Sequence, residues 1–141
     1  MPTDVALSRK QIGGETPMIA VEITDQCVYT GLFGSIDSTR MAEITDEITA
    51  KCEEVETSIV IIDLANVDAI DTAIASHLLR LGDVLRLIGV TPIYCGITGI
   101  VARVMTSAGV EFENIIISRD LKSALKKSFQ ISGYELTAKA S

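Results

Sequence analysis

Apolar positions along this chain follow two patterns that alternate. Short continuous apolar runs are typical of buried strands, whereas apolar residues spaced by three and four are typical of helices buried along one side. After residue 26 the two patterns take turns with short connections, in the order β-α-β-α-β-α-β-α. This order predicts an α/β domain with a mainly parallel sheet.

The first two runs are separated by the turn residues Thr24, Asp25 and Gln26, so we expect the sheet to begin with an antiparallel hairpin. The third run is apolar on both faces, which is typical of a central strand in a parallel sheet. The expected strands span 18–23, 27–33, 58–64, 91–95 and 115–117.

The strongest helical pattern places Ile74, Leu78, Leu81, Leu85 and Ile88 on one side and ends at Gly89, a common residue after a helix. Three further helices are expected. The first, of about fifteen residues, begins after residues 35–37 and buries Met41, Ile44, Ile48 and Cys52. The second is short and spans 100–107, with Thr98 as its N-cap. The last is capped by Ser118 or Asp120 and buries Leu121, Leu125 and Phe129.

A chain of 141 residues suits one domain. We assign residues 18–132 to that domain, residues 1–17 to an N-terminal arm or short edge element, and residues 133–141 to a C-terminal tail. Hydrophobic residues make up 48% of the chain but aromatic residues only 4%. The expected core is therefore built from aliphatic side chains.

Charge and cysteine content limit the possible partners. The net charge is −7 and the pI is near 4.6, and the one modest basic cluster, Lys122, Lys126 and Lys127, suits a solvated helix face. We therefore expect no nucleic-acid partner. Three cysteines without a CxxC pair and a single histidine disfavour a zinc site. No run is apolar and long enough to cross a membrane, so we expect a cytoplasmic protein with no membrane partner.

The richest chemistry lies where the run 59–64 is followed by Asp68, Asp71 and Thr72. Thr72 stands at an expected helix start, where unpaired backbone N–H groups carry partial positive charge. One interpretation is that its hydroxyl simply caps the helix. The other is that it accepts a phosphate, which adds about −1.5 to −2 charge. The sequence by itself leaves both open.

Other sites are weaker alternatives. Asp63, Asp68 and Asp71 are residue types that bind Mg²⁺. Residues 96–99 contain two glycines but lack the spacing of a nucleotide-binding loop. His77 is a lone histidine without a Ser, Cys or Asp constellation, which is typical of a surface or core-edge residue, and no G-x-S-x-G sequence occurs. We therefore expect no catalytic residue, no metal and no cofactor.

The segments DLANVDAIDTAIASHLLRLGDVLRLIG and CGITGIVARVM closely resemble the STAS family of anti-anti-sigma factors, in particular the stressosome scaffold and co-antagonist subgroup known as RsbS and RsbR. The resemblance runs from about Met18 to Phe129. It implies a STAS-like fold and places Thr72 at the family's phosphorylatable Ser/Thr. It also implies a non-enzymatic partner-switching role in a signalling pathway.

The resemblance further implies three kinds of partner: a serine/threonine kinase of the switch type, a PP2C-type phosphatase that reverses the modification, and other STAS-domain proteins in a homo- or hetero-oligomer. A second phosphorylation position of one subgroup falls on Val104, with Thr106 close by, so a site near Thr106 stays open. The expected partner-binding residues are Asp37, Ser38, Asp68, Asp71, Ser76, Thr98 and Gly99.

Three questions remain open from the sequence. The chain has the length of a scaffold protein but the threonine acceptor of a co-antagonist. A small-ligand or nucleotide-binding STAS sensor is the alternative function. A detached cytosolic domain of an anion-transporter type protein is a third possibility, and its interaction role would be the same.

Overall fold

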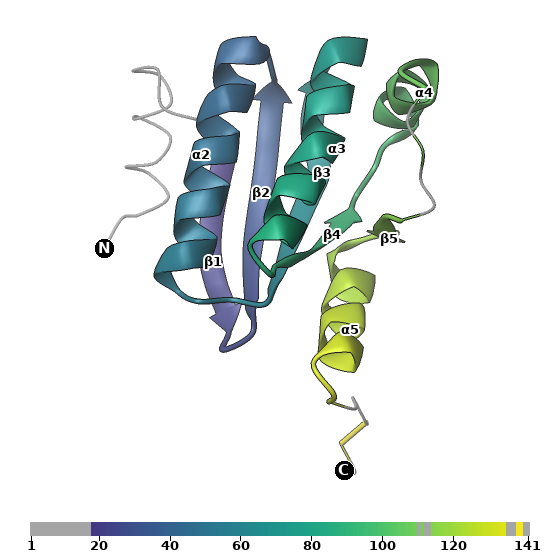
Figure 1. Cartoon of the computed structure of the whole chain (residues 1–141). Helices are drawn as coiled ribbons and strands as arrows, with labels where there is room; N and C mark the ends of the chain where they lie inside the picture. The colour runs from purple at the N-terminus through teal and green to yellow at the C-terminus, as the bar shows by residue number, and fades with distance from the viewer. Residues whose placement is uncertain (1–17, 110, 112–113, 135–137, 140–141) are drawn as a thin grey trace, which may run out of the picture.

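A five-stranded mixed sheet forms the centre of the computed structural model, which describes residues 18–109, 111, 114–134 and 138–139 (Figure 1). The strands lie in the order of the chain, with β1 antiparallel to β2 and the others parallel. This confirms the predicted α/β fold and its leading hairpin. The strands are β1 (Met18–Thr24), β2 (Cys27–Ser35), β3 (Ile59–Ala69), β4 (Thr91–Cys95) and β5 (Ile116–Ser118).

Helices cover the two faces of the sheet unequally (Figure 1). The apolar sides of α2, α3 and α4 join one core cluster on the first face, and α5 joins a smaller cluster on the second. We call these the three-helix face and the α5 face. Within the described residues no helix is long and apolar enough to cross a bilayer. The helices are α2 (Ser38–Glu54), α3 (Thr72–Leu87), α4 (Gly99–Ser107) and α5 (Leu121–Ile131).

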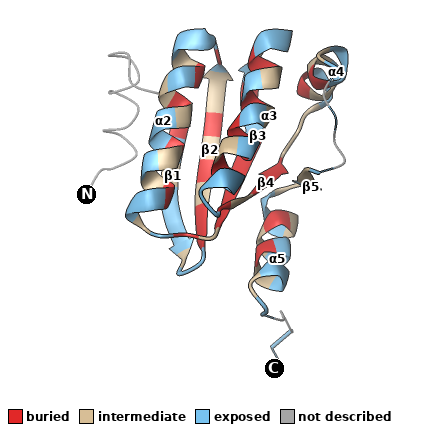
Figure 2. Ribbon diagram, viewed as in Figure 1, coloured by how far each residue is buried: buried red, intermediate tan, exposed pale blue. Residues whose placement is uncertain are grey.

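Strand β3 supplies both cores, because side chains alternate across a strand. Val60 and Ile62 point to the three-helix face, whereas Ile59 and Ile61 point to the α5 face, and all four are at most 1% exposed. The first six residues of this strand, 59–64, are all buried, and Figure 2 shows the red of buried residues concentrated in the central strands. The two-sided apolar run is therefore the central strand that the sequence predicts.

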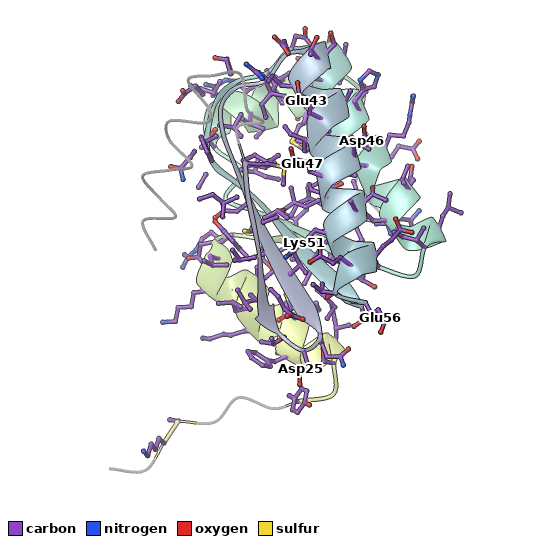
Figure 3. The ribbon with its side chains drawn as sticks, turned by 90° about the vertical axis from the view of Figure 1, so that its left-hand side faces the viewer. Asp25, Glu43, Asp46, Glu47, Lys51 and Glu56 are labelled. Atoms are coloured by element: carbon purple, nitrogen blue, oxygen red, sulfur yellow. The ribbon has the colours of Figure 1, made fainter. Side chains whose placement is uncertain are left out.

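Helix α2 shows the amphipathic pattern in a simple form. Its inner side buries the four predicted residues, from Met41 to Cys52. Its outer surface carries Glu43, Asp46, Glu47 and Lys51 (Figure 3). The acidic residues of this helix are therefore directed to solvent, as expected from their spacing.

Two strands continue at least two residues beyond their predicted ends. The expected strand 58–64 continues to Ala69, and the expected strand 27–33 continues to Ser35. After an irregularity in the register, residues 33–35 of β2 pair with residues 66–69 of β3. Polar residues here point to solvent, which hides the strand from a hydrophobic pattern. The acidic segment before Thr72 is thus mostly strand, and the loop is only two residues long.

The buried side of α5 also differs from the prediction. Ala124 and Ser128 are buried, whereas Leu121 is 36% exposed and Leu125 packs only at the edge of the smaller core. Small side chains let the helix backbone approach the sheet closely. Phe129 instead forms an edge-to-face contact with Tyr134. In α3 the last predicted core residue, Ile88, lies beyond the helix as its C-cap and is 42% exposed.

Helix α3 is fixed to the sheet by one buried hydroxyl. Tyr94 on β4 is fully buried, and its Oη donates a hydrogen bond to the Leu78 carbonyl oxygen at 2.8 Å. A Cβ atom at Gly82 would lie 2.7 Å from that Oη, closer than nonbonded atoms tolerate. Gly82 therefore lies in the middle of a helix because the tyrosine passes against its backbone.

We predict that Gly82→Ala destabilises the protein by about 1–3 kcal/mol, as overpacking of a filled core does. In an exposed helix the same change would stabilise by about 1 kcal/mol. Urea unfolding of Gly82→Ala alone and in a Tyr94→Phe background checks this, because phenylalanine lacks the oxygen that the new methyl meets. An equal cost in the two backgrounds would contradict the explanation.

Candidate functional site

The carboxyl ends of β2, β3 and β4 lie at one edge of the sheet, because parallel strands end on the same side. Each of these strands is followed within a few residues by the start of α2, α3 or α4. The first two connections are joined directly: the Ile36 N–H donates to the Ala69 carbonyl oxygen at 3.1 Å. Three helix N-termini are thus brought to one edge (Figure 1), which we call the switch edge.

Each of these helices begins with a side-chain cap, as the sequence predicts for α4. The carboxylate Oδ1 of Asp37 accepts from the Arg40 N–H at 2.8 Å, and Oδ1 of Asp71 accepts from the Ile74 N–H at the same distance. The Thr98 hydroxyl accepts from the Val101 N–H at 3.4 Å. Asp71 therefore caps α3, and the interpretation that Thr72 is the cap is wrong.

Thr72 is the first residue inside α3, and its side chain is exposed. Its hydroxyl has no hydrogen-bond partner in the described parts of the chain. The N–H groups of a first helical turn lack partners within the helix and give this end partial positive charge. The hydroxyl is thus accessible to another protein, in a place where an added negative group is stabilised by the helix.

The predicted docking residues divide into two groups. Asp37, Ser38, Asp68, Asp71 and Gly99 are exposed at the switch edge and Thr98 is half-buried there. Ser76 is different, because it is half-buried one turn further along α3. It lines a cavity of about 350 Å³ on the side of α3 toward the α4–β5 connection. The structure therefore separates Ser76 from the exposed surface around Thr72.

Asp63 differs from the other acidic residues of this segment in its burial and in its place along β3, five residues before Asp68. It lies on the α5 face and is 8% exposed, with Oδ2 accepting from the Tyr29 hydroxyl at 2.7 Å and Oδ1 from the Ala65 N–H at 3.0 Å. Burial and then this carboxylate raise the pKa of Tyr29 above its usual value, and they raise the pKa of Cys95 to about 12. The carboxylate is thus engaged inside the protein.

That geometry does not support the magnesium alternative. The described residues contain no group of three or more His, Cys, Asp and Glu side chains arranged to hold a metal ion. Asp68 and Asp71 are exposed at the switch edge, whereas Asp63 is buried on the α5 face.

The two glycines of residues 96–99 have separate explanations. Gly96 has φ +69°, and a Cβ there would lie 2.5 Å from Asp63 Oδ1 and 2.8 Å from the Ala65 nitrogen. Only glycine allows this close approach. Gly99 opens α4 directly after the Thr98 cap. This segment is therefore a tight strand-to-helix connection rather than a phosphate-binding loop.

Ile100 is an exposed residue of the switch edge that sequence reasoning missed. It lies in the first turn of α4 with 58% of its surface exposed. Its neighbours Val101 and Met105 are buried, so the spacing of that pair could have placed Ile100 on the outer side. Further along the helix Thr106 is also exposed, but its hydroxyl donates to the Ala102 carbonyl oxygen at 2.9 Å.

Comparison with known proteins identifies relatives of this fold. The family model of the STAS domain matches residues 18–124. The RsbT co-antagonist protein RsbRD of Bacillus subtilis (strain 168) is 27% identical over 125 residues, which are 88% of this chain and 45% of that protein. The chain thus spans less than half the length of this curated relative.

Two solved structures share the fold. A serine-to-glutamate variant of RsbS from Moorella thermoacetica superposes with a TM-score of 0.71 at 16% identity, over 82% of this chain and 97% of that one. The anti-sigma factor antagonist SpoIIAA in its unphosphorylated form gives a TM-score of 0.66 at 15% identity, over 84% and 99% of the two chains. At these identities the likeness concerns the fold alone.

Because Asp71 caps α3 and the Thr72 hydroxyl does not, substitutions at the two residues are expected to change the free energy of unfolding differently. Asp71→Ala removes the cap of α3 and is expected to destabilise by about 1 kcal/mol, and Asp37→Ala on α2 is a matched control with the same expected cost. Thr72→Ala removes only an exposed hydroxyl and is expected to change stability by less than about 0.5 kcal/mol. Urea unfolding measures all three. A Thr72→Ala cost equal to that of Asp71→Ala would show that the hydroxyl holds the helix start.

Proposed function

The chain belongs to the STAS domain family, and we propose that it is a non-enzymatic interaction switch that is regulated by phosphorylation of Thr72. One observation carries the proposal: the Thr72 hydroxyl is exposed at the start of α3 while Asp71 performs the capping. The role stated in the name of the relative RsbRD, RsbT co-antagonist, supports a function in binding and releasing a signalling protein.

A phosphate on Thr72 would meet two opposing influences within the fold. The helix N-terminus stabilises an anion by about 0.3–1 kcal/mol at an exposed site. Asp68 and Asp71 repel it, because both are exposed carboxylates within four residues of the acceptor. The effects largely offset each other, so the modified domain stays folded. A partner surface that fits a small hydroxyl contains no group that offsets the added negative charge. The phosphate therefore weakens the binding of that partner.

The proposed partners are those that the family resemblance implies. A serine/threonine kinase of the switch type binds the unmodified switch edge through residues 37–38, 68–72 and 98–99. A PP2C-type phosphatase removes the phosphate, and other STAS-domain proteins bind the domain in a stressosome-like cytoplasmic assembly. All three helix N-termini lie at one edge, so the kinase contacts α2 and α4 while it reaches Thr72.

A small-ligand sensor is the alternative function, and the cavity beside Ser76 is the place in which it would bind a ligand. Two arginines, Arg80 and Arg86, line this cavity. The guanidinium of Arg86, however, already donates to the Asp83 carboxylate and to the Asn114 carbonyl oxygen. One of the two arginine side chains is therefore already bonded within the protein, which leaves less positive charge for an anionic ligand. For this reason we propose the phosphorylation switch as the function.

We predict that the cognate kinase and ATP modify Thr72 as the principal residue. Two other hydroxyls are internal comparisons. Ser76 is half-buried, and Thr106, near which the sequence leaves a second site open, donates to the Ala102 carbonyl oxygen. Tandem mass spectrometry after incubation locates the phosphate. Efficient modification elsewhere with Thr72 untouched would refute the assignment.

Substitutions at Thr72 distinguish the effect of side-chain charge on kinase affinity from the effect of side-chain shape. Thr72→Ala is expected to keep kinase affinity within about threefold, because only a hydroxyl is lost. Thr72→Asp is expected to weaken it at least tenfold, because a charge enters the interface. Thr72→Asn is the matched neutral control for Asp and should bind more tightly than it. Titration calorimetry or biolayer interferometry gives the affinities; equal binding of Asp and Asn would mean that charge is not the signal.

A further inference from the structure

A groove of about 230 Å³ lies between α2 and α3 on the three-helix face. The two helices run side by side, and both begin at the switch edge (Figure 1). Buried Met41 and Leu81 form the floor of the groove. Ala42 of α2 and Val84 of α3, which are less buried, lie on its two sides. The groove is thus apolar inside and suits an apolar side chain of another protein.

The groove is continuous with the switch edge. Ser38, the first residue of α2 and one of the predicted docking residues, lines it. On α3, His77 and Arg80 line it and follow Thr72 by five and eight residues. At a rise of about 1.5 Å per residue, these positions lie roughly 7 and 12 Å along the helix axis from Thr72. A protein docked at Thr72 therefore reaches the groove as well, because a specific interface occupies about 800 Å² on each partner.

Arg80 is an exposed cation on the α3 side of this groove. Arg40, Arg86 and Arg119 each form an ion pair with a carboxylate. Arg80 forms no ion pair or hydrogen bond with any residue in the described ranges. The acidic residue of its own helix, Asp83, is engaged by Arg86 at 3.2 Å. In a chain with a net charge of −7, this guanidinium is therefore available to a carboxylate of another protein.

Charge on the two sides of the groove fixes how a partner segment lies in it. The outer surface of α2 carries Glu43, Asp46 and Glu47 (Figure 3), and these carboxylates repel an acidic side chain. Arg80 on α3 attracts one, and an arginine binds a carboxylate through two parallel hydrogen bonds. Arginine is also among the residues that contribute most to binding at protein interfaces. The fitting segment therefore has an apolar residue for the groove and a carboxylate beside it on the α3 side.

We propose that Arg80 and the groove select the kinase that modifies Thr72. An apolar side chain of the kinase enters the groove, and a neighbouring carboxylate of the kinase binds Arg80. This role rests on the proposed phosphorylation of Thr72 and adds the chemistry by which the partner is recognised. Because Arg80 lies about two turns of α3 beyond the acceptor, it contributes to the affinity for the kinase and not to the transfer of the phosphoryl group.

Steady-state kinetics of Thr72 phosphorylation by the cognate kinase, with the full chain as substrate, test this role. Arg80→Gln removes the charge and is expected to raise the KM for this protein at least fivefold, with kcat within twofold of the wild type. Lys126→Gln removes the same charge from an exposed position on α5, on the other face of the sheet, and should leave KM unchanged. Equal KM values for the two variants would overturn the proposal.

A second pair of variants tests the groove itself. Ala42→Gln places a longer side chain in the groove and is expected to raise KM at least fivefold. Ala50→Gln makes the same change at another exposed position of α2, outside the groove, and should behave like the wild type. Thermal unfolding checks that the variants are folded. If Ala42→Gln is not, Arg80→Gln at its exposed position decides. Equal KM values for folded Ala42→Gln and Ala50→Gln would refute the entry of a kinase side chain into the groove.

Charge reversal identifies the carboxylate on the kinase. Arg80→Glu is combined with kinase variants in which each surface Asp or Glu is changed to Lys, and one of them is expected to restore at least tenfold of the lost affinity. No restoration would overturn the pairing. Normal modification of Thr72 with unchanged KM in every variant refutes this role alone, whereas an unmodified Thr72 in the wild type refutes the proposed function as well. Variants that weaken only the binding of another STAS-domain protein would assign the groove to that protein and overturn the proposal.

Discussion

The burial of β3 on both faces is the constraint from which the rest of this structure follows. A strand that is apolar on both sides has to be covered on both sides, which requires helices above and below the sheet. Its alternate residues supply both core clusters, from Val60 and Ile62 on one face to Ile59 and Ile61 on the other. The strand then continues, paired with β2, to Ala69. That extension holds the start of α3 in a fixed place at the edge of the sheet.

At that edge, two adjacent residues divide two tasks. A capping side chain must turn back onto its own helix, and a group that accepts a phosphate must remain free to meet an enzyme. One residue cannot do both at once. The Asp71 carboxylate accepts from the Ile74 N–H at 2.8 Å, which leaves the Thr72 hydroxyl exposed and without a hydrogen-bond partner among the residues that the structure describes. The local stability of α3 and the chemistry at its first residue are therefore separable, as a switch requires.

The sequence predicts the fold well because the decisive signals are local and periodic. The order of strands and helices, the β4 bounds 91–95 and the Thr98 cap all follow from spacing and capping chemistry. The errors have one common origin. The final residues of β2 and β3 and the buried side of α5 are determined by contacts with distant segments. A polar strand end such as Asn66–Ala69 is held by pairing, and Ala124 is buried because the sheet is close.

The candidate site could be predicted only in part for the same reason. Hydroxyl and acidic residues at a helix start identify the place but not which of them is the cap, since Asp and Thr are both good N-caps. Ser76 has a suitable position along the chain yet faces a cavity, because that side of α3 turns toward the α4–β5 connection. The helical period of 3.6 residues per turn does not by itself separate Ser76 from Thr72, which lies four residues earlier. A shift of four residues keeps a side chain on nearly the same side, but the neighbouring elements change along the helix.

The sheet also limits where a charge added at Thr72 acts. In our proposal, docking and modification belong to the carboxyl edge of β2, β3 and β4, whereas β1 lies at the end of the strand order with β2 between it and β3. A phosphate at the start of α3 therefore acts on the surface formed by the three helix N-termini. Because that surface lies outside the paired part of the sheet, phosphorylation can release a partner without a change in strand pairing.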